Sequence, residues 1–386
     1  MKLVNRILGV VLALLLYGGL NFYIGWHGAV WLKSLGVTGV MGLSIYWTSF
    51  AVTVFGYILA LVIKGPLGRF LKVIGSFYFA ILQYAILFLP ILDLGLWIAS
   101  LAGWSVRSHT TVIGTVVLIV FALLLLWGSR NNWSTVVRQH SLTINKDAGE
   151  RKKLRILVAS DIHLGNIKGN RFLKKLSKIS KDVKPDMILI PGDLLDGDIE
   201  PFKRNQMNET LKSLQAPLGV YAVLGNHEYY GGAVEEFIQL VEEAGIKMLQ
   251  DEAIEINESF YVVGRKDKTA EASQYGGRKS VTDLLETLNH KKPILLLDHQ
   301  PYHLDKAEEA GADLMLSGHT HRGQMAPNHW ITSRLFELDY GYKQKGKMHA
   351  LVSSGYGSWG PPIRIGSRSE VLQIDLTFTG NGEKGN

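Results

Sequence analysis

The sequence contains no cysteine among its 386 residues. Disulfide bonds, thiolate metal ligands and cysteine nucleophiles are therefore excluded. A metal ion bound by this protein must be held by nitrogen and oxygen atoms, which suits manganese, iron, zinc or similar ions.

Acidic residues are almost absent from the first third of the chain, where Asp93 is the single carboxylate before residue 129, whereas charged residues are frequent from Arg130 onward. A chain of this length exceeds a typical single domain. We therefore predict a transmembrane domain over residues 1–128, a basic linker over 129–153, a catalytic domain over 154–378 and a disordered tail over 379–386.

The chain is basic, with a formal net charge of +7 and a pI near 9.2. Much of this excess falls in the expected membrane loops and in the linker. Anionic lipid headgroups attract such clusters. We therefore predict membrane lipids as partners and no nucleic acid, while the oligomeric state stays undetermined.

The apolar stretches of the first domain are long enough to cross a hydrocarbon core, which needs about 20 residues. The third contains Gln83, and its apolar pattern continues past Pro90 and Asp93 to Ala102. We expect Asp93 to be an interfacial carboxylate after a proline bend, with a functional intramembrane acid as the alternative. The four predicted spans are residues 7–24, 37–63, 73–92 and 111–127.

Basic residues flank the predicted spans unevenly. Lys33 and Arg107 stand nearly alone on one side, and the opposite side has the larger number. Cytoplasmic loops have this excess, so we predict a multi-pass cell-membrane protein with a cytoplasmic catalytic domain; a fifth span would reverse this orientation. The residues of the basic side are Lys2, Arg6, Lys64, Arg69, Lys72, Arg130 and Arg138.

From Leu154 the pattern changes to short apolar runs separated by amphipathic segments. Continuous apolar runs are typical of strands buried on both faces, and apolar residues at helical spacing predict the intervening helices. The soluble half is therefore predicted to be an α/β domain. Its expected strands are 156–159, 187–190, 220–224, 254–256, 260–263, 294–297, 314–317, 350–353 and 371–376, and two helices are expected near 172–183 and 234–241.

Five of these strands are followed by polar clusters rich in Asp, His and Asn. A single His at a strand end is commonly a surface histidine, and Gly-Asp or Gly-Asn is a common turn. Ligands bind at the carboxyl ends of strands in open α/β sheets, so five successive clusters predict one shared metal site. The clusters are Ser160-Asp161-Ile162-His163, Gly192-Asp193-Leu194-Leu195-Asp196, Gly225-Asn226-His227-Glu228, Asp298-His299 and Gly318-His319-Thr320-His321.

This series of motifs resembles the calcineurin-like metallophosphoesterase superfamily, and all five blocks are present without substitution. The runs 318–324 and 355–360 look like the YkuE and YaeI branch, whose members are often attached to membranes. The resemblance covers about residues 154–378. It implies a membrane α-helical bundle joined to a four-layer α/β/β/α sandwich.

The resemblance also implies the roles of single residues. Two divalent metal ions would be bound, with Asp193 bridging both, and a hydroxide activated by the metals would be the nucleophile. By similarity, the first metal is held by Asp161, His163 and His321, and the second by Asn226, His299 and His319.

Three further residues are predicted to assist the reaction. By similarity, His227 would protonate the leaving group or stabilise charge on the phosphoryl group, and Asp196 would orient it; a loop cap is the alternative for Asp196. Arg322 could pair with a phosphate oxygen, since guanidinium groups match phosphate geometry, or could be structural. Glu228 is taken as a motif companion without a ligand role, and His303, which has no matching block, is taken as a bystander.

The sequence thus predicts a membrane-anchored hydrolase of phosphomonoester, phosphodiester or pyrophosphate bonds. A membrane tether raises the effective concentration of lipid-linked substrates, so a lipid-linked or envelope-related substrate is favoured. The alternatives are a non-catalytic membrane receptor or scaffold that retains the fold, an outward-facing enzyme acting on cell-wall polymers, and a protein phosphatase.

Overall fold

The computed structural model describes residues 2–63 and 65–380. The chain divides into a helical unit, which includes the residues up to Ser129, and an α/β unit, which begins at Arg130. Lys64 and residues 381–386 of the predicted tail lie outside the described residues.

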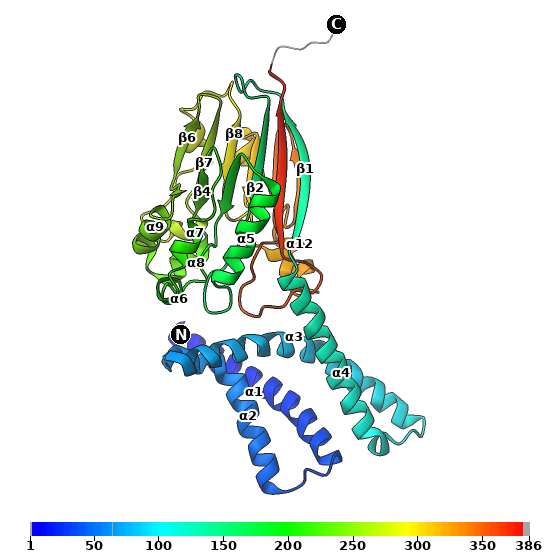
Figure 1. Ribbon diagram of the computed structural model, residues 1–386. Helices are drawn as coiled ribbons and strands as arrows, with labels where there is room; N and C mark the ends of the chain where they lie inside the picture. Colours follow the sequence, from blue (N-terminus) through cyan, green and yellow to red (C-terminus); the bar gives the residue numbers. More distant parts are fainter. Residues whose placement is uncertain (1, 64, 381–386) are drawn as a thin grey trace. The chain divides into compact units, whose positions relative to one another are not determined.

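The helical unit contains four helices that are long and apolar enough to cross a membrane, as predicted. The first, third and fourth extend beyond the predicted spans, whereas the second lies within the predicted span 37–63, and the third passes without interruption through Pro90 and Asp93. A proline inside a helix removes one backbone hydrogen bond and commonly bends the helix. The helices are α1 (Lys2–Ser34), α2 (Val40–Val62), α3 (Gly65–Leu101) and α4 (Val106–Trp133) (Figure 1).

The α/β unit is built on two six-stranded sheets. In spatial order, the first contains β1 (Val136–Ile144), β12 (Glu370–Phe378), β2 (Lys153–Val158), β3 (Met187–Pro191), β4 (Val220–Val223) and β5 (Ile246–Met248). The second contains β10 (Gly341–Lys345), β11 (Met348–Val352), β9 (Leu314–Ser317), β8 (Ile294–Leu297), β7 (Phe260–Gly264) and β6 (Glu252–Ile256).

The sheets share one apolar core, in which Ile156 and Leu189 of the first sheet join Leu295 and Leu316 of the second. Helices cover both outer faces. Burying each apolar face against another layer is what stabilises such domains, and the predicted four-layer α/β/β/α arrangement is confirmed. The first face is covered by α5 (Asn170–Val183), α7 (Met207–Leu211) and α9 (Val234–Glu242), and the second by α10 (Val281–Leu285) and α11 (Leu304–Glu309).

Short helices occupy several of the loops. They are α6 (Glu200–Arg204), α8 (Asn226–Gly231) and α12 (His329–Leu335), with the 3-10 turns η1 (Lys268–Glu271), η2 (Ser273–Tyr275) and η3 (His321–Gly323). Among these, α8 begins at a predicted metal ligand and η3 contains another, so both belong to the loops that carry the site.

Much of the basic linker predicted over residues 129–153 has regular secondary structure. The helix α4 continues to Trp133, and β1 then pairs in parallel with β12 along its whole length (Figure 1). Leu142 and Ile144 of β1 are buried in the core between the sheets. The exposed polar residues Gln139, Ser141 and Thr143 alternate with the buried Leu142 and Ile144, because one face of this edge strand is exposed, and they hid the strand in the sequence.

Candidate metal centre

The five predicted strand-end clusters come together at one end of the two packed sheets. Strands β2, β3 and β4 are parallel neighbours in the first sheet, and β8 and β9 are parallel neighbours in the second. Their carboxyl ends therefore point the same way within each sheet. Six of the seven predicted ligands, together with His227, form three groups in which all ligand atoms lie within 4.8 Å of one another: Asp161, His163 and His321; His163, Asp193 and His227; and Asp193, His299 and His319.

The first group brings two imidazole nitrogens close together. Nε2 of His163 lies 3.0 Å from Nε2 of His321, which lies 3.5 Å from Oδ1 of Asp161. All three side chains are at most 2% exposed. Oδ2 of Asp161 is buried and has no hydrogen-bond partner among the described residues. Two converging nitrogens beside an unpaired carboxylate oxygen fit a divalent cation with nitrogen and oxygen ligands.

Asn226, the seventh predicted ligand, lies beside His299 and His319, and these three residues are called the second ligand group below. Oδ1 of Asn226 lies 2.8 Å from Nδ1 of His319 and 3.2 Å from Nε2 of His299. Nδ1 of His299 lies 2.9 Å from the carbonyl oxygen of Pro191. A proton on Nδ1 satisfies that carbonyl and leaves the lone pair of Nε2 free for a metal, the usual arrangement of metal-binding histidines.

Asp193 connects the first ligand group, which contains His163, with the second, which contains His299. Its Oδ2 lies 3.2 Å from Nε2 of His299 and 3.7 Å from Nε2 of His163. Its Oδ1 accepts a hydrogen bond from the backbone N–H of His227 at 3.0 Å, which fixes the carboxylate. One carboxylate thus faces both sets of nitrogens, the position that a bridging ligand between two cations requires.

Several of these ligands have left-handed backbone conformations. The φ angles of Asp161, His163 and Asp193 lie between 51° and 52°, and those of His319 and His321 are 70° and 50°. Such conformations cost of order 1–3 kcal/mol each outside glycine and concentrate at functional sites. Backbone hydrogen bonds from Asp161 to Gly192 and from His163 to Asp193, both 3.0 Å, hold two of them in place.

Gly225 leaves space for the central carboxylate. A Cβ atom on this residue would lie 2.1 Å from Oδ1 of Asp193, closer than any side chain tolerates. Its φ of −106° is accessible to other residues. The glycine of the Gly-Asn-His-Glu motif is therefore required for close approach and not for its backbone angle.

Burial and the neighbouring charges set the pKa values in the site. Burial, with the positive charge of His299, lowers the pKa of His319 to about 4, so its imidazole is neutral near pH 7. Burial raises the pKa of Asp193, but the positive charge of His299 and its hydrogen bond outweigh this and hold the pKa well below its usual range. Burial alone would lower the pKa of His299, but the ionised Asp193 beside it raises that pKa well above its usual value. A neutral imidazole and an ionised carboxylate are the forms that bind metals, so His299 would release the proton on Nε2 when a metal binds.

The assisting residues lie at the rim. His227 is 23% exposed, and its ring centroid lies 4.6 Å from that of His163. Oδ1 of Asp196 lies 3.7 Å from Nδ1 of His227 and 3.5 Å from Nδ1 of His163, so it faces both rings. The guanidinium of Arg322 lies 4.6 Å from the ring centroid of Tyr340.

Two supporting residues were missed as such in the sequence. Glu228 is buried, and its two carboxylate oxygens accept hydrogen bonds from the backbone N–H groups of Leu195 and Gly225, each at 2.7 Å. It thereby joins the loops after β3 and β4. Its position three residues after Gly225 is a capping pattern that could have indicated this contact.

Arg364 is the second residue that was missed. Its guanidinium is fully buried, with Nη2 2.6 Å from the carbonyl oxygen of Ser354, 2.5 Å from that of Gly357 and 3.1 Å from Nδ1 of His321. It therefore holds the loop after β11 in place and also contacts Nδ1 of the predicted ligand His321. No local pattern in the sequence marks it.

The fold and this group of side chains define a metal-binding α/β/β/α protein. Residues 154–323 match the family model described as calcineurin-like phosphoesterase. An uncharacterized metallophosphoesterase of Aquifex aeolicus is 33% identical over 232 residues, which are 59% of this chain and 87% of that relative. The chain belongs to the calcineurin-like phosphoesterase family.

Animal relatives also match. A zebrafish protein named transmembrane protein with metallophosphoesterase domain is 32% identical over 233 residues, which are 58% of this chain and 53% of that protein. The alignment thus spans about half the length of this relative. A solved structure titled a dimetal phosphatase from Danio rerio aligns with a TM-score of 0.35 and 14% identity, over 59% of this chain and all of that one. The narrower resemblance to the YkuE and YaeI branch stays a prediction.

Proposed function

We propose that the protein is a dimetal phosphoesterase anchored in a membrane by its four apolar helices. The observation that carries this proposal is the position of Asp193, whose carboxylate faces nitrogens of both ligand groups. A non-catalytic scaffold would not need to retain the complete ligand set, so the enzyme is favoured over a receptor.

The two ligand groups would hold one divalent cation each. Asp161, His163 and His321 would bind the first, Asn226, His299 and His319 the second, and Asp193 both. When bound, such a pair supplies Lewis acidity at the phosphoryl oxygens and lowers the pKa of water. Manganese, iron and zinc all suit these nitrogen and oxygen ligands.

The rim residues would then act on the substrate. His227 reaches from the buried site to solvent, so its imidazole can donate a proton to the leaving oxygen. Asp196 faces Nδ1 of His227 and would hold that ring in position. Arg322, in η3 directly after His321, would pair with a phosphate oxygen after leaving the ring of Tyr340.

The surroundings of the second ligand group support a lipid-linked substrate. The ring of Phe336 lies 6.0 Å from that of His319 and 4.8 Å from that of Tyr302. Neighbouring α12, which packs against η3, exposes Trp330, Ile331 and Leu335 by 59–66%. A group of exposed apolar side chains beside a phosphate-directed site fits a substrate with a hydrocarbon portion.

The uneven distribution of basic residues supports a cytoplasmic catalytic unit. Thiol labelling of single cysteines tests this orientation, because the natural chain has none. In intact cells, an impermeant reagent should label a cysteine placed in the loop 35–39 and spare one placed at Glu243. The opposite pattern would overturn the orientation.

The enzymatic proposal is tested with purified full-length protein in detergent. Phosphomonoesters, phosphodiesters and lipid pyrophosphates are screened with manganese, iron or zinc, and Asp193→Asn is the control. Metal-dependent hydrolysis that Asp193→Asn abolishes is expected, with lipid-linked compounds preferred. Absence of hydrolysis by metal-loaded protein would overturn the catalytic function, and a preference for free nucleotides would overturn the substrate class.

A further inference from the structure

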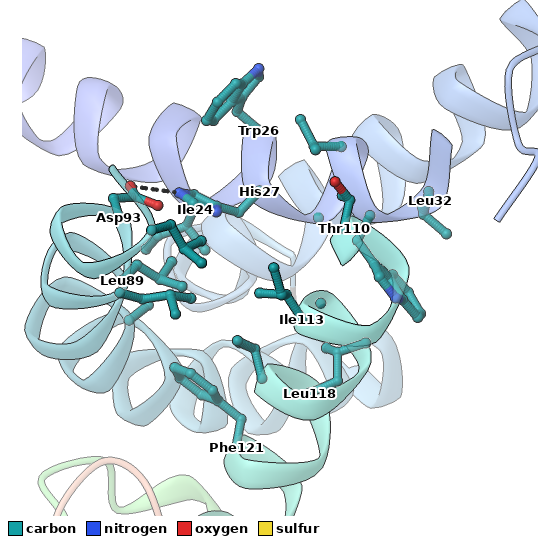
Figure 2. A pocket seen from close by; sticks show the side chains of 18 of the residues that line it. Ile24, Trp26, His27, Leu32, Leu89, Asp93, Thr110, Ile113, Leu118 and Phe121 are labelled. Atoms are coloured by element: carbon teal, nitrogen blue, oxygen red, sulfur yellow. Dashed lines mark hydrogen bonds and ion pairs between the residues drawn. The ribbon is translucent and has the colours of Figure 1, made fainter. Parts of the chain in front are cut away.

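The helical unit contains a pocket that the phosphoesterase site does not use. It has a volume of about 450 Å³ and is lined by side chains from all four helices, most of them apolar (Figure 2). Pockets that bind small ligands commonly measure about 300–1,000 Å³ and combine an apolar lining with a few polar groups.

The lining of the pocket includes one carboxyl group, that of Asp93, the single acid of the helical unit's sequence. Nε2 of His27 lies 3.2 Å from Oδ2 of Asp93 (Figure 2). Tyr23 donates a hydrogen bond to the same oxygen. The side chains of Asp93 and His27 remain 39% and 23% exposed. The carboxyl group of α3 is therefore oriented by two residues of α1 while part of it stays open to an occupant.

Hydrogen-bonded aromatic side chains form part of the pocket wall. The hydroxyl of Tyr46 donates to the carbonyl oxygen of Gly25 at 2.7 Å, and Nε1 of Trp31 donates to Oγ1 of Thr115 at 3.2 Å. A Cβ atom on Gly28 would lie 2.1 Å from the hydroxyl oxygen of Tyr46. The wall thus depends on specific contacts and on a glycine that leaves room for a ring.

The pocket is elongated along the helices. Its lining on α4 extends from Val106 to Phe121, which is about 22 Å at 1.5 Å per residue. His27 is seven residues from the end of α1 and Asp93 eight residues from the end of α3, so the carboxyl group lies part of the way along the pocket, whose lining continues past it to Ile81 of α3 and Phe121 of α4. A polar group beside a long apolar lining matches a molecule with a small head and a hydrocarbon chain.

The carboxyl group of Asp93 determines which kind of head group the pocket can bind. An ionisable group within a hydrocarbon layer is costly unless it is paired. A carboxylate has about four acceptor positions, and an ammonium group brings three donors and the opposite charge. We propose that this pocket binds an ammonium-bearing amphipath, whose head pairs with Asp93 and whose chain lies between the helices. The proposal rests on the part of the proposed function that places these helices in a bilayer.

Photoreactive probes with the same hydrocarbon chain and three different heads test the assignment. Full-length protein in detergent is irradiated with the ammonium, hydroxyl or carboxylate probe, and the labelled peptides are mapped by mass spectrometry. The ammonium probe should label peptides of α1, α3 and α4 at least tenfold more than the carboxylate probe. Equal labelling by the three probes, or a preference for the carboxylate, would overturn the proposal.

Two variants address the head and the chain separately. Asp93→Asn removes the charge, and Val117→Phe fills the pocket without changing the carboxyl group; each should lower specific labelling at least tenfold. Tyr78→Phe is the matched control, because it removes an interhelical hydrogen bond to Asn21, a residue that does not line this pocket. Undiminished labelling in both pocket variants would refute the site.

The source of the ammonium group is distinguished in nanodiscs. Competition by a bilayer of ethanolamine-headed phospholipid, compared with choline-headed phospholipid, identifies a membrane lipid; competition only by an added long-chain amine identifies a free amphipath. Asp193→Asn protein should keep its labelling while losing hydrolysis. Failure of the phosphoesterase function and failure of the pocket are therefore separate results.

Discussion

Gly318 and Asp161 are so close that a Cβ atom on the glycine would lie 2.1 Å from Oδ2 of the carboxylate. This is the buried oxygen that has no hydrogen-bond partner among the described residues. The glycine of the Gly-His-x-His motif therefore leaves room for a ligand that comes from a loop far away in the sequence.

Gly318→Ala is expected to displace Asp161 and to weaken metal binding by about 10- to 100-fold, the usual effect of disturbing the support of a metal ligand. Calorimetric titration with manganese measures the change. Gly169→Ala is the matched control, because a Cβ there would lie 3.7 Å from Cε of Met207, an ordinary contact. Equal affinities in the two variants would contradict the steric explanation.

The position of β1 predicts where the soluble unit begins. A fragment that starts at Arg130 should fold and bind metal, whereas one that starts at Leu154 should aggregate, because β12 loses a full-length partner and the core loses Leu142 and Ile144. An exposed edge strand and an open core favour association between chains. Gel filtration and circular dichroism compare the fragments; a monomeric, folded Leu154 fragment would show that β1 is dispensable.

Glu228 should stabilise the domain through its two buried hydrogen bonds. Glu228→Gln keeps the shape but places an amide donor against a backbone donor, so the free energy of unfolding should fall by about 1–3 kcal/mol. Urea denaturation of metal-free protein measures this. Glu236→Gln is the control, because Glu236 forms an exposed ion pair with Lys203, and such pairs contribute about 0–1 kcal/mol. A smaller loss for Glu228→Gln than for the control would be inconsistent with this role.

His227→Gln should lower kcat by about 10²- to 10⁴-fold, the range of a general acid, while metal content stays at the level of the unaltered protein. Asp196→Asn should have a smaller effect in the same direction, since it acts through the ring of His227. Elemental analysis and steady-state kinetics separate metal loss from lost chemistry. Unchanged turnover by metal-loaded His227→Gln would remove this histidine from the reaction, and His303→Gln, at an exposed position, is the control.

The exposed side chains of α12 should matter only for substrates in a membrane. Trp330→Ser combined with Ile331→Ser should lower kcat/KM at least tenfold for a lipid phosphate in vesicles and leave it unchanged for a soluble short-chain phosphate. Val137→Ser, on the exposed face of β1, controls for a general change in surface polarity. Equal losses on both substrates would indicate a structural role of α12.

Local patterns in the sequence determined much of the fold. The apolar runs at 294–297 and 314–317 coincide with β8 and β9, because a strand buried on both faces has no polar interruption. The strands β1 and β10 were missed because they are edge strands with many polar residues. The strand β5 was missed because it has only three residues, with Lys247 exposed at its centre.

The chemistry of the strand ends was also readable from the sequence, because parallel strands direct their carboxyl ends to one edge. Only the tertiary structure decided which distant groups touch: Glu228 with the backbone of Leu195, Arg364 with His321, and Asp93 with Tyr23 and His27. Side-chain spacing along the chain encodes the period of a helix or strand. Contacts between such elements depend on sheet order and helix packing, which no local spacing contains.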